Sequence, residues 1–171
     1  APIGNDEFCA SSAKQRVVGP AKTISAICKH TDPQIGLRLL RACSGFCKLV
    51  YSVRVIATHA HIAELRRFDS LVRQVFSDLT GVHPTDSEWD QATRGFDSAG
   101  LGLRSTADHG LGAYLASRAN SWARCREIDE HFTWEIDSPN SAPASALTAI
   151  NALLAPEQQL SAETLPTTRQ K

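Results

Sequence analysis

Basic side chains are the residues of this sequence whose types and spacing best fit a chemical task. Six of them lie on the polar flanks of two neighbouring predicted helices: Arg38, Arg41, Lys48, Arg66, Arg67 and Arg73. Two such flanks side by side would form a groove that binds a phosphate backbone. Few aromatic residues are interleaved with them, so base stacking is less expected. A solvated, arginine-rich surface explains the pattern equally well, because surface charge mostly serves solubility.

Two short motifs contain residue types that ligate metals. His59 and His61 are two positions apart, which places both rings on one side only in an extended segment, and no cysteine is close in sequence. Cys43 and Cys47 share one face of a predicted helix, inside its apolar stripe, where a free cysteine packs as a small hydrophobe. We therefore predict surface or capping histidines, core cysteines and no metal site.

The Gly100-Leu101-Gly102 stretch precedes a capped helix, as phosphate-cradling loops do. Its spacing matches neither the dinucleotide-binding nor the P-loop pattern, and no strand precedes it. Close backbone packing explains these glycines as well. The sequence also lacks a G-x-S-x-G motif and a recognisable pair of carboxylates in an apolar setting. The sequence therefore predicts no catalytic residue and no cofactor.

The elements that position these residues follow a helical pattern almost throughout. The clearest helix spans residues 62–79, with apolar residues on one half of its circumference. An earlier helix starts at the Thr31-Asp32-Pro33 cap and contains Gly45, which marks close packing or a kink. A glycine-rich loop at 96–103 precedes the helix that carries Tyr114. No strand pair is evident, so the predicted class is all-α, an irregular bundle of about six to eight helices.

The predicted organisation is one large helical unit followed by smaller segments. The helical domain covers residues 1–136, a linker covers 137–145, a short helix covers 146–155 and a loose polar tail covers 156–171. Inside the first domain, the N-terminal helix is predicted to stop at Gly19-Pro20.

The overall charge is zero, with 18 Lys and Arg against 18 Asp and Glu. This balance argues against a uniformly basic nucleic-acid binder. The charge is nevertheless divided along the chain. Residues 1–76 contain eleven basic and five acidic residues, whereas residues 77–171 contain seven and thirteen. Opposed halves favour an internal electrostatic contact or a basic face for an anionic partner, and a chance division is the alternative.

The location of the protein is constrained only weakly. No segment reaches the roughly 18 consecutive apolar residues of a membrane helix, and the start does not resemble a signal peptide. Five scattered cysteines do not form a disulfide framework, which favours an intracellular, reducing compartment. The sequence has no Met, even at position 1, which indicates a processed product, an excised piece or a partial reading of a longer protein.

Several stretches, taken together, resemble one protein family. They are Ala1-Pro2-Ile3-Gly4 with Phe8-Cys9, the LLRACSGFCKLV block of residues 39–50, Phe68-Asp69 with Val72-Arg73, Leu79-Thr80-Gly81, the GLGLRS block of residues 100–105 and the AYLAS block of residues 113–117. In this order and spacing they resemble the region after the polymerase palm, the thumb and connection, of retroelement reverse transcriptases. Such reverse transcriptases are common in marine invertebrate and dinoflagellate genomes. The resemblance covers most of the chain, roughly residues 1–165.

The resemblance implies a helical thumb that grips a template–primer duplex through its backbone. Within the matching blocks it marks Arg41, Lys48, Arg73 and Arg104 as contact positions. The palm of this family carries paired aspartates for metal-assisted nucleotidyl transfer. This sequence has no Asp-Asp pair. The expected function is therefore a non-catalytic module derived from an RNA-directed DNA polymerase.

One position departs from the family, and one alternative function remains. Two glycines usually open the Gly-Leu-Gly block of the family, but the first of them is Ala99 here. A positive φ at this position would be costly for alanine. The alternative function is a helical scaffold or accessory subunit within a larger multi-protein assembly, with protein partners and no nucleic-acid role.

Overall fold

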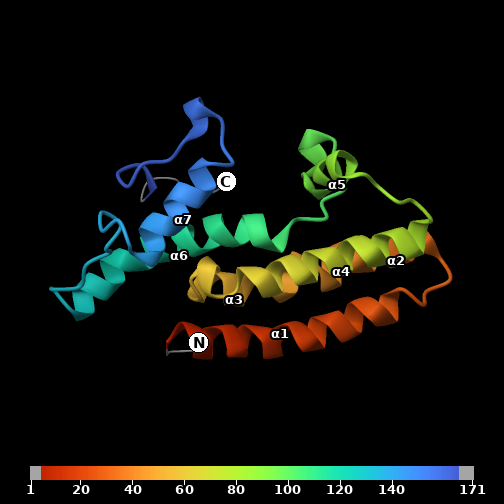
Figure 1. Ribbon diagram of the computed structural model, residues 1–171, viewed down its shortest axis with the longest axis horizontal. Coiled ribbons are helices and arrows are strands. Elements are labelled where there is room, and N and C mark those ends of the chain that lie inside the picture. The colour runs from red at the N-terminus through yellow and green to blue at the C-terminus, as the bar shows by residue number, and fades with distance from the viewer. Residues whose placement is uncertain (1–4, 166–171) are drawn as a thin grey trace.

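The computed structural model describes residues 5–165 of the chain. Within these residues no strand occurs and helices predominate, which confirms the predicted all-α class. The helices are α1 (Asp6–Ile27), α2 (Pro33–Leu39), α3 (Val50–Val55), α4 (Ile62–Thr80), α5 (Asp86–Thr93), α6 (Thr106–Ile128) and α7 (Ala142–Asn151). In Figure 1, α1 runs beside α4, and α6 leads away from them to α7.

α4 is the central helix, and its bounds agree closely with the predicted 62–79. Its apolar half is buried at Leu65, Phe68, Val72, Val75, Phe76 and Leu79. The helix ends at Gly81, whose φ of +70° suits glycine. α2 packs closely on α4 at Gly36, because a Cβ there would come within 2.8 Å of the Leu79 side chain. Glycine therefore sets the distance between these two helices.

α1 is one continuous helix, so the predicted stop at Gly19-Pro20 is wrong. Proline inside a helix loses a backbone hydrogen bond and costs about 3 kcal/mol. Buried apolar side chains lie on both sides of Pro20, with Val17 before it and Ile24 and Ile27 after it. All three belong to the apolar cluster that surrounds α4. Burial of both halves against one core outweighs the local cost of proline.

The helix predicted from Pro33 onward is interrupted at Gly45. A π-helical turn spans Leu40–Ser44, Gly45 has a non-helical ψ of −139°, and a 3-10 turn spans Phe46–Lys48 before α3. The interruption ends the regular period of 3.6 residues on which the predicted apolar stripe depended. Cys43 and Cys47 are both exposed. The prediction that they pack in the core is therefore wrong.

α6 joins two apolar clusters. The first surrounds α4 and includes Ala107 near the start of α6. The second contains Tyr114 and Leu115 of the same helix, together with residues of α7 and the segments beside it. The N-terminus of α6 is fixed to α4 because the Asp69 carboxylate accepts from the N–H of Thr106 at 2.7 Å and of Ala107 at 3.0 Å.

The C-terminal segment differs from its prediction in two respects. α7 spans Ala142–Asn151 rather than the predicted 146–155, with Ser141 as its N-cap. Residues 156–171 are predicted to be loose, but the described part of this segment is bonded to Asn151. The Asn151 side chain donates to the carbonyl of Leu160 and accepts from its N–H, each at 2.8 Å. Leu165 is buried in the second cluster, and residues 166–171 lie outside the described residues.

Candidate nucleic-acid interface

The loop between α5 and α6 folds back against the end of α5. The N–H groups of Gly100, Leu101 and Gly102 donate to backbone carbonyls of residues 92–95 at 2.8 to 3.0 Å. A Cβ on Gly100 would collide with the carbonyl group of Arg94. These N–H groups are used within the loop and are not available to cradle a phosphate. Close backbone packing therefore explains the Gly-Leu-Gly stretch.

An open pocket of about 420 Å³ lies beside this loop. Its lining comes from the turns at residues 40–47, from Val72 of α4 and from the loop at residues 95–104. Arg41 and Arg104, both predicted contact residues, line it. We call it the Arg41–Arg104 pocket. Folding therefore brings together two basic residues that are distant in the sequence.

Arg41 is held against an aromatic ring. Its guanidinium carbon lies 4.6 Å from the centroid of the Phe96 ring, a cation–π geometry. The Arg41 side chain passes Gly102, where a Cβ would come within 3.2 Å of Arg41 Cδ. Gly102 also has a φ of +70°, which only glycine adopts without strain. In the part of the chain that the structure describes, Arg41 forms no ion pair with a carboxylate.

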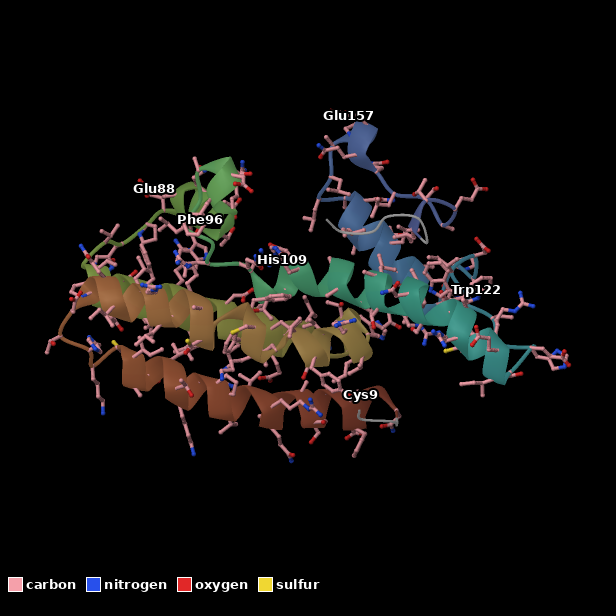
Figure 2. The ribbon with its side chains drawn as sticks, turned by 180° about the vertical axis from the view of Figure 1, so that it is seen from behind. Cys9, Glu88, Phe96, His109, Trp122 and Glu157 are labelled. Carbon is pink, nitrogen blue, oxygen red and sulfur yellow. The ribbon has the colours of Figure 1, made fainter. Side chains whose placement is uncertain are left out.

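Arg104 is exposed and stands close to His109 at the start of α6. Burial and the nearby Arg104 charge lower the pKa of His109, and these effects outweigh a hydrogen bond to the Ser105 carbonyl and two nearby carboxylates. The His109 ring packs against Phe46, with centroids 5.4 Å apart. Figure 2 labels Phe96 on the loop and His109 at the start of α6. Arg41 and Arg104 are the basic residues of the pocket lining.

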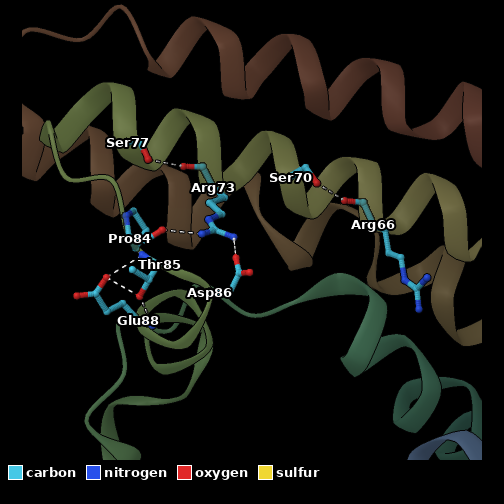
Figure 3. Close-up of polar contacts among 8 residues, drawn as sticks. All are labelled: Arg66, Ser70, Arg73, Ser77, Pro84, Thr85, Asp86 and Glu88. Atoms are coloured by element: carbon cyan, nitrogen blue, oxygen red, sulfur yellow. Dashed lines mark hydrogen bonds and ion pairs between the residues drawn. The ribbon is translucent and has the colours of Figure 1, made fainter.

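Arg73, also a predicted contact residue, bonds to other residues of the chain. Its guanidinium donates to Asp86 Oδ1 at 2.7 Å and to the Pro84 carbonyl at 2.6 Å (Figure 3). It also lies 5.8 Å from the centroid of the Trp89 ring. These contacts fasten the start of α5 to α4. The capping box of Thr85 and Glu88 then begins α5. Arg73 thus positions the element that carries the pocket loop.

The remaining predicted contact residues are exposed on the surface. They are Arg38 in the last turn of α2, Lys48 in the 3-10 turn, and Arg66 and Arg67 on α4. Over residues 5–165, no ion pair joins any of the four to a carboxylate. Figure 3 shows Arg66 and Arg73 on the side of α4 that faces α5 and α6. These cations are accessible to an anionic partner.

The prediction of surface or capping histidines is wrong for His61, whose side chain is buried and forms no cap hydrogen bond to α4. His61 is 2% exposed, and its Nδ1 lies 3.0 Å from the Ala57 carbonyl oxygen. Its Nε2 is buried with no hydrogen-bond partner among the described residues. Burial lowers the pKa of His61. Within residues 5–165, no three His, Cys, Asp or Glu side chains are grouped to hold a metal ion.

Two residues at this site escaped the sequence analysis. Phe46 and Phe96 line the Arg41–Arg104 pocket, although each is an isolated aromatic residue in the sequence. Phe96 is 60% exposed, which is unusual for a large apolar side chain beside a folded core. The position of Phe96 close to the Gly-Leu-Gly stretch could have indicated its role, since a glycine loop permits close approach of other side chains.

Comparisons with known proteins give no neighbour from which a function transfers. No protein-family model, curated protein or solved structure matches this chain. Among the helices of residues 5–165, none combines the length and apolar character needed to cross a membrane. The functional argument therefore rests on the site itself.

Proposed function

We propose that this chain is a non-catalytic helical module that binds the phosphate backbone of a nucleic acid, in the manner of the reverse-transcriptase thumb that its sequence resembles. The observation that carries the proposal is the convergence of Arg41 and Arg104 at one open pocket. These residues come from two separate blocks of the resemblance. Neither forms an ion pair with a carboxylate of the described residues.

A second contact between the matching blocks supports the same proposal. Asp69 belongs to the Phe68-Asp69 block, and it caps the helix that follows the Gly100–Ser105 block through Thr106 and Ala107. It also accepts from the Ser105 hydroxyl at 2.9 Å. This contact sets the distance between α4, which carries Arg66 and Arg67, and the loop that carries Arg104. The basic side chains of both segments are thereby held in a fixed arrangement.

Backbone binding of this kind has a measurable signature. Each lysine or arginine that neutralises a phosphate releases a counterion, so affinity falls as salt rises. We expect binding to a 20-base-pair DNA–RNA hybrid, followed by fluorescence anisotropy, to weaken steeply with salt. Arg104→Gln, Arg67→Gln and Lys48→Gln should each reduce the slope of log K against log salt by about one.

The matched control is Arg124→Gln. Arg124 is an exposed arginine near the far end of α6 and lies 3.8 Å from Glu127. Its replacement changes the net charge as much as the other variants but should leave the slope unchanged. Absence of duplex binding at low salt would contradict the proposed function. Equal slopes for Arg124→Gln and Arg104→Gln would contradict the proposed location.

The scaffold alternative has one observation in its favour. Large apolar side chains stand exposed at the end of α6 and after α7, with Ile128 89% and Leu153 60% accessible. Exposed apolar residues of this size are typical of protein interfaces when they cluster. The scaffold alternative predicts that the chain binds no duplex and forms a stable complex with other proteins. Ile128→Ser and Leu153→Ser should then weaken that complex.

A further inference from the structure

We propose that the Arg41–Arg104 pocket binds one unpaired nucleotide at the edge of the bound duplex, with its base on Phe96 and its phosphate beside Arg104. This inference rests on the proposed function and makes it more specific. A backbone groove alone needs no pocket and no aromatic lining. The feature to be explained is therefore a hollow that joins two arginines to two aromatic rings.

The size and lining of the pocket fit this ligand. Small-molecule sites range from about 300 to 1,000 Å³ and combine apolar walls with a few polar groups. The pocket, at about 420 Å³, lies in the lower part of that range. Leu40, Val72 and Leu103 contribute apolar lining, while Arg41 and Arg104 contribute charge. A nucleotide needs both kinds of surface, because its base is flat and largely apolar on its faces and its phosphate is anionic.

The Phe96 ring is accessible to a base that could stack on it. The Arg41 guanidinium covers part of the ring at 4.6 Å and thereby fixes its orientation, while most of the side chain stays open to solvent. Aromatic side chains that are exposed beside basic residues are the usual platform for an unpaired base. A base that stacks here would extend an existing arrangement of guanidinium and ring.

The charge of the lining favours a nucleotide over a simple anion. Asp97 places one carboxylate on the lining beside the two arginines. A carboxylate disfavours an inorganic anion, but it can accept hydrogen bonds from the amino groups of a base. The pocket is therefore matched to a ligand that carries both an anion and hydrogen-bond donors.

The test compares three duplexes at one salt concentration. One is blunt, one has a single-nucleotide overhang, and one has an abasic overhang with the same phosphate. The base-bearing overhang should bind about tenfold more tightly than the other two. Phe96→Leu should reduce this ratio to about one. Phe132→Leu is the matched control, because Phe132 faces Arg118 at 5.7 Å on α6, outside the pocket lining, and should keep the ratio.

Cysteine reactivity provides a second readout that needs no variant. Cys47 lines the pocket and Cys43 does not, although both are exposed. The base-bearing overhang should slow alkylation of Cys47 at least threefold more than it slows that of Cys43, and the abasic overhang should not. Equal affinities for base-bearing and abasic overhangs, with blunt binding intact, would overturn this inference alone. Absence of all duplex binding would overturn the proposed function with it.

Discussion

Ala99 occupies a left-handed backbone conformation, with φ of 56° and ψ of 28°, at the turn before the Gly-Leu-Gly stretch. An L-residue in this conformation costs about 1–2 kcal/mol, and glycine avoids most of that cost. Part of the gain is offset, because glycine is also more flexible in the unfolded chain. Ala99→Gly should therefore raise the free energy of unfolding by about 0.5–1 kcal/mol, measured by urea denaturation.

Gly100, the next residue, provides the control, because its replacement should change the free energy of unfolding in the opposite direction. Gly100→Ala places a methyl group against the Arg94 carbonyl, and the backbone must move to accommodate it. This change should lower the free energy of unfolding by about 2 kcal/mol. A loss of stability in Ala99→Gly would show that the turn does not hold Ala99 in the left-handed region.

His61 makes stability depend on pH. Burial lowers its pKa in the folded state below the usual 6.5, so between these two values the unfolded chain binds more protons than the folded chain. The free energy of unfolding should therefore fall as pH drops from above 6.5 through the lowered pKa of folded His61. His61→Gln should remove this part of the difference in stability between pH 7.5 and pH 5.

The exposed His83 is the comparison for this measurement. His83→Gln should leave the difference between the two pH values unchanged. His109, whose pKa is also lowered, contributes with the same sign and remains in both variants. If His61→Gln kept the full pH dependence, burial of the His61 ring would not be its source.

Residue-level prediction from the sequence succeeded where a local rule decides the outcome. The strain of a positive φ at Ala99 depends on a few adjacent residues. Prediction failed for Cys43 and Cys47, because their burial depended on an uninterrupted helix. The aromatic lining of the pocket was also missed, since it arises only when the 40–47 and 95–104 segments meet.

At the scale of elements, Asp69 connects α4 to α6. Its carboxylate accepts from two N–H groups in the first turn of α6, at Thr106 and Ala107. Negative charge at a helix N-terminus is favoured by the helix dipole as well as by these bonds. Asp69→Ala should lower the free energy of unfolding by about 2 kcal/mol. Hydrogen exchange of the Thr106 and Ala107 amides should quicken in the same variant.

Asp69→Asn keeps the shape and one acceptor oxygen, so it should lose about half as much stability. Asp78→Ala is a control on the same helix, because Asp78 is exposed and bonds only to side chains, those of Gln74 and Cys28, among the described residues. It should change stability by about 0.5 kcal/mol or less. Equal losses in Asp69→Ala and Asp78→Ala would contradict the connecting role of Asp69.

Helix bounds were predictable where the core and the local signals agree. α4 has a regular apolar half and a glycine stop, and both were visible in the sequence. The bounds of α1 and of the helix predicted from Pro33 could not be predicted from the sequence, because tertiary packing determined both. Burial around Pro20 kept one helix whole, whereas close packing at Gly45, where a Cβ would come within 3.3 Å of the Leu40 carbonyl oxygen, accompanies the break in the other.

At the scale of the whole molecule, one ion pair among the described residues joins the basic half of the chain to the acidic half. Arg73 belongs to the basic half and Asp86 to the acidic half, and their side chains are 32% and 97% exposed. An exposed pair of this kind contributes little to stability. Arg66 and Arg67 of the basic half are exposed and form no ion pair with a carboxylate of the described residues, which leaves them for an anionic partner.

We expect the two apolar clusters along α6 to form regions of different stability. The first holds α1 and α4, and the second holds α7 and the segment that ends at Leu165. The second cluster is smaller and is closed by the two hydrogen bonds between Asn151 and Leu160. Asn151→Ala removes both bonds and should release residues 160–165. Native-state hydrogen exchange should then quicken in α7 and leave α4 protected.

The comparison variant is Gln159→Ala, whose exposed side chain makes one bond, to the Asn151 carbonyl at 3.3 Å. It should leave the exchange of α7 nearly unchanged. If Asn151→Ala quickened exchange equally in α4, the clusters would unfold as one cooperative unit. If α7 alone is affected, duplex affinity should also survive in Asn151→Ala, because the Arg41–Arg104 pocket is built on the first cluster. Local unfolding of the second cluster with unchanged duplex affinity would thus show that the proposed interface does not need the C-terminal part of the chain.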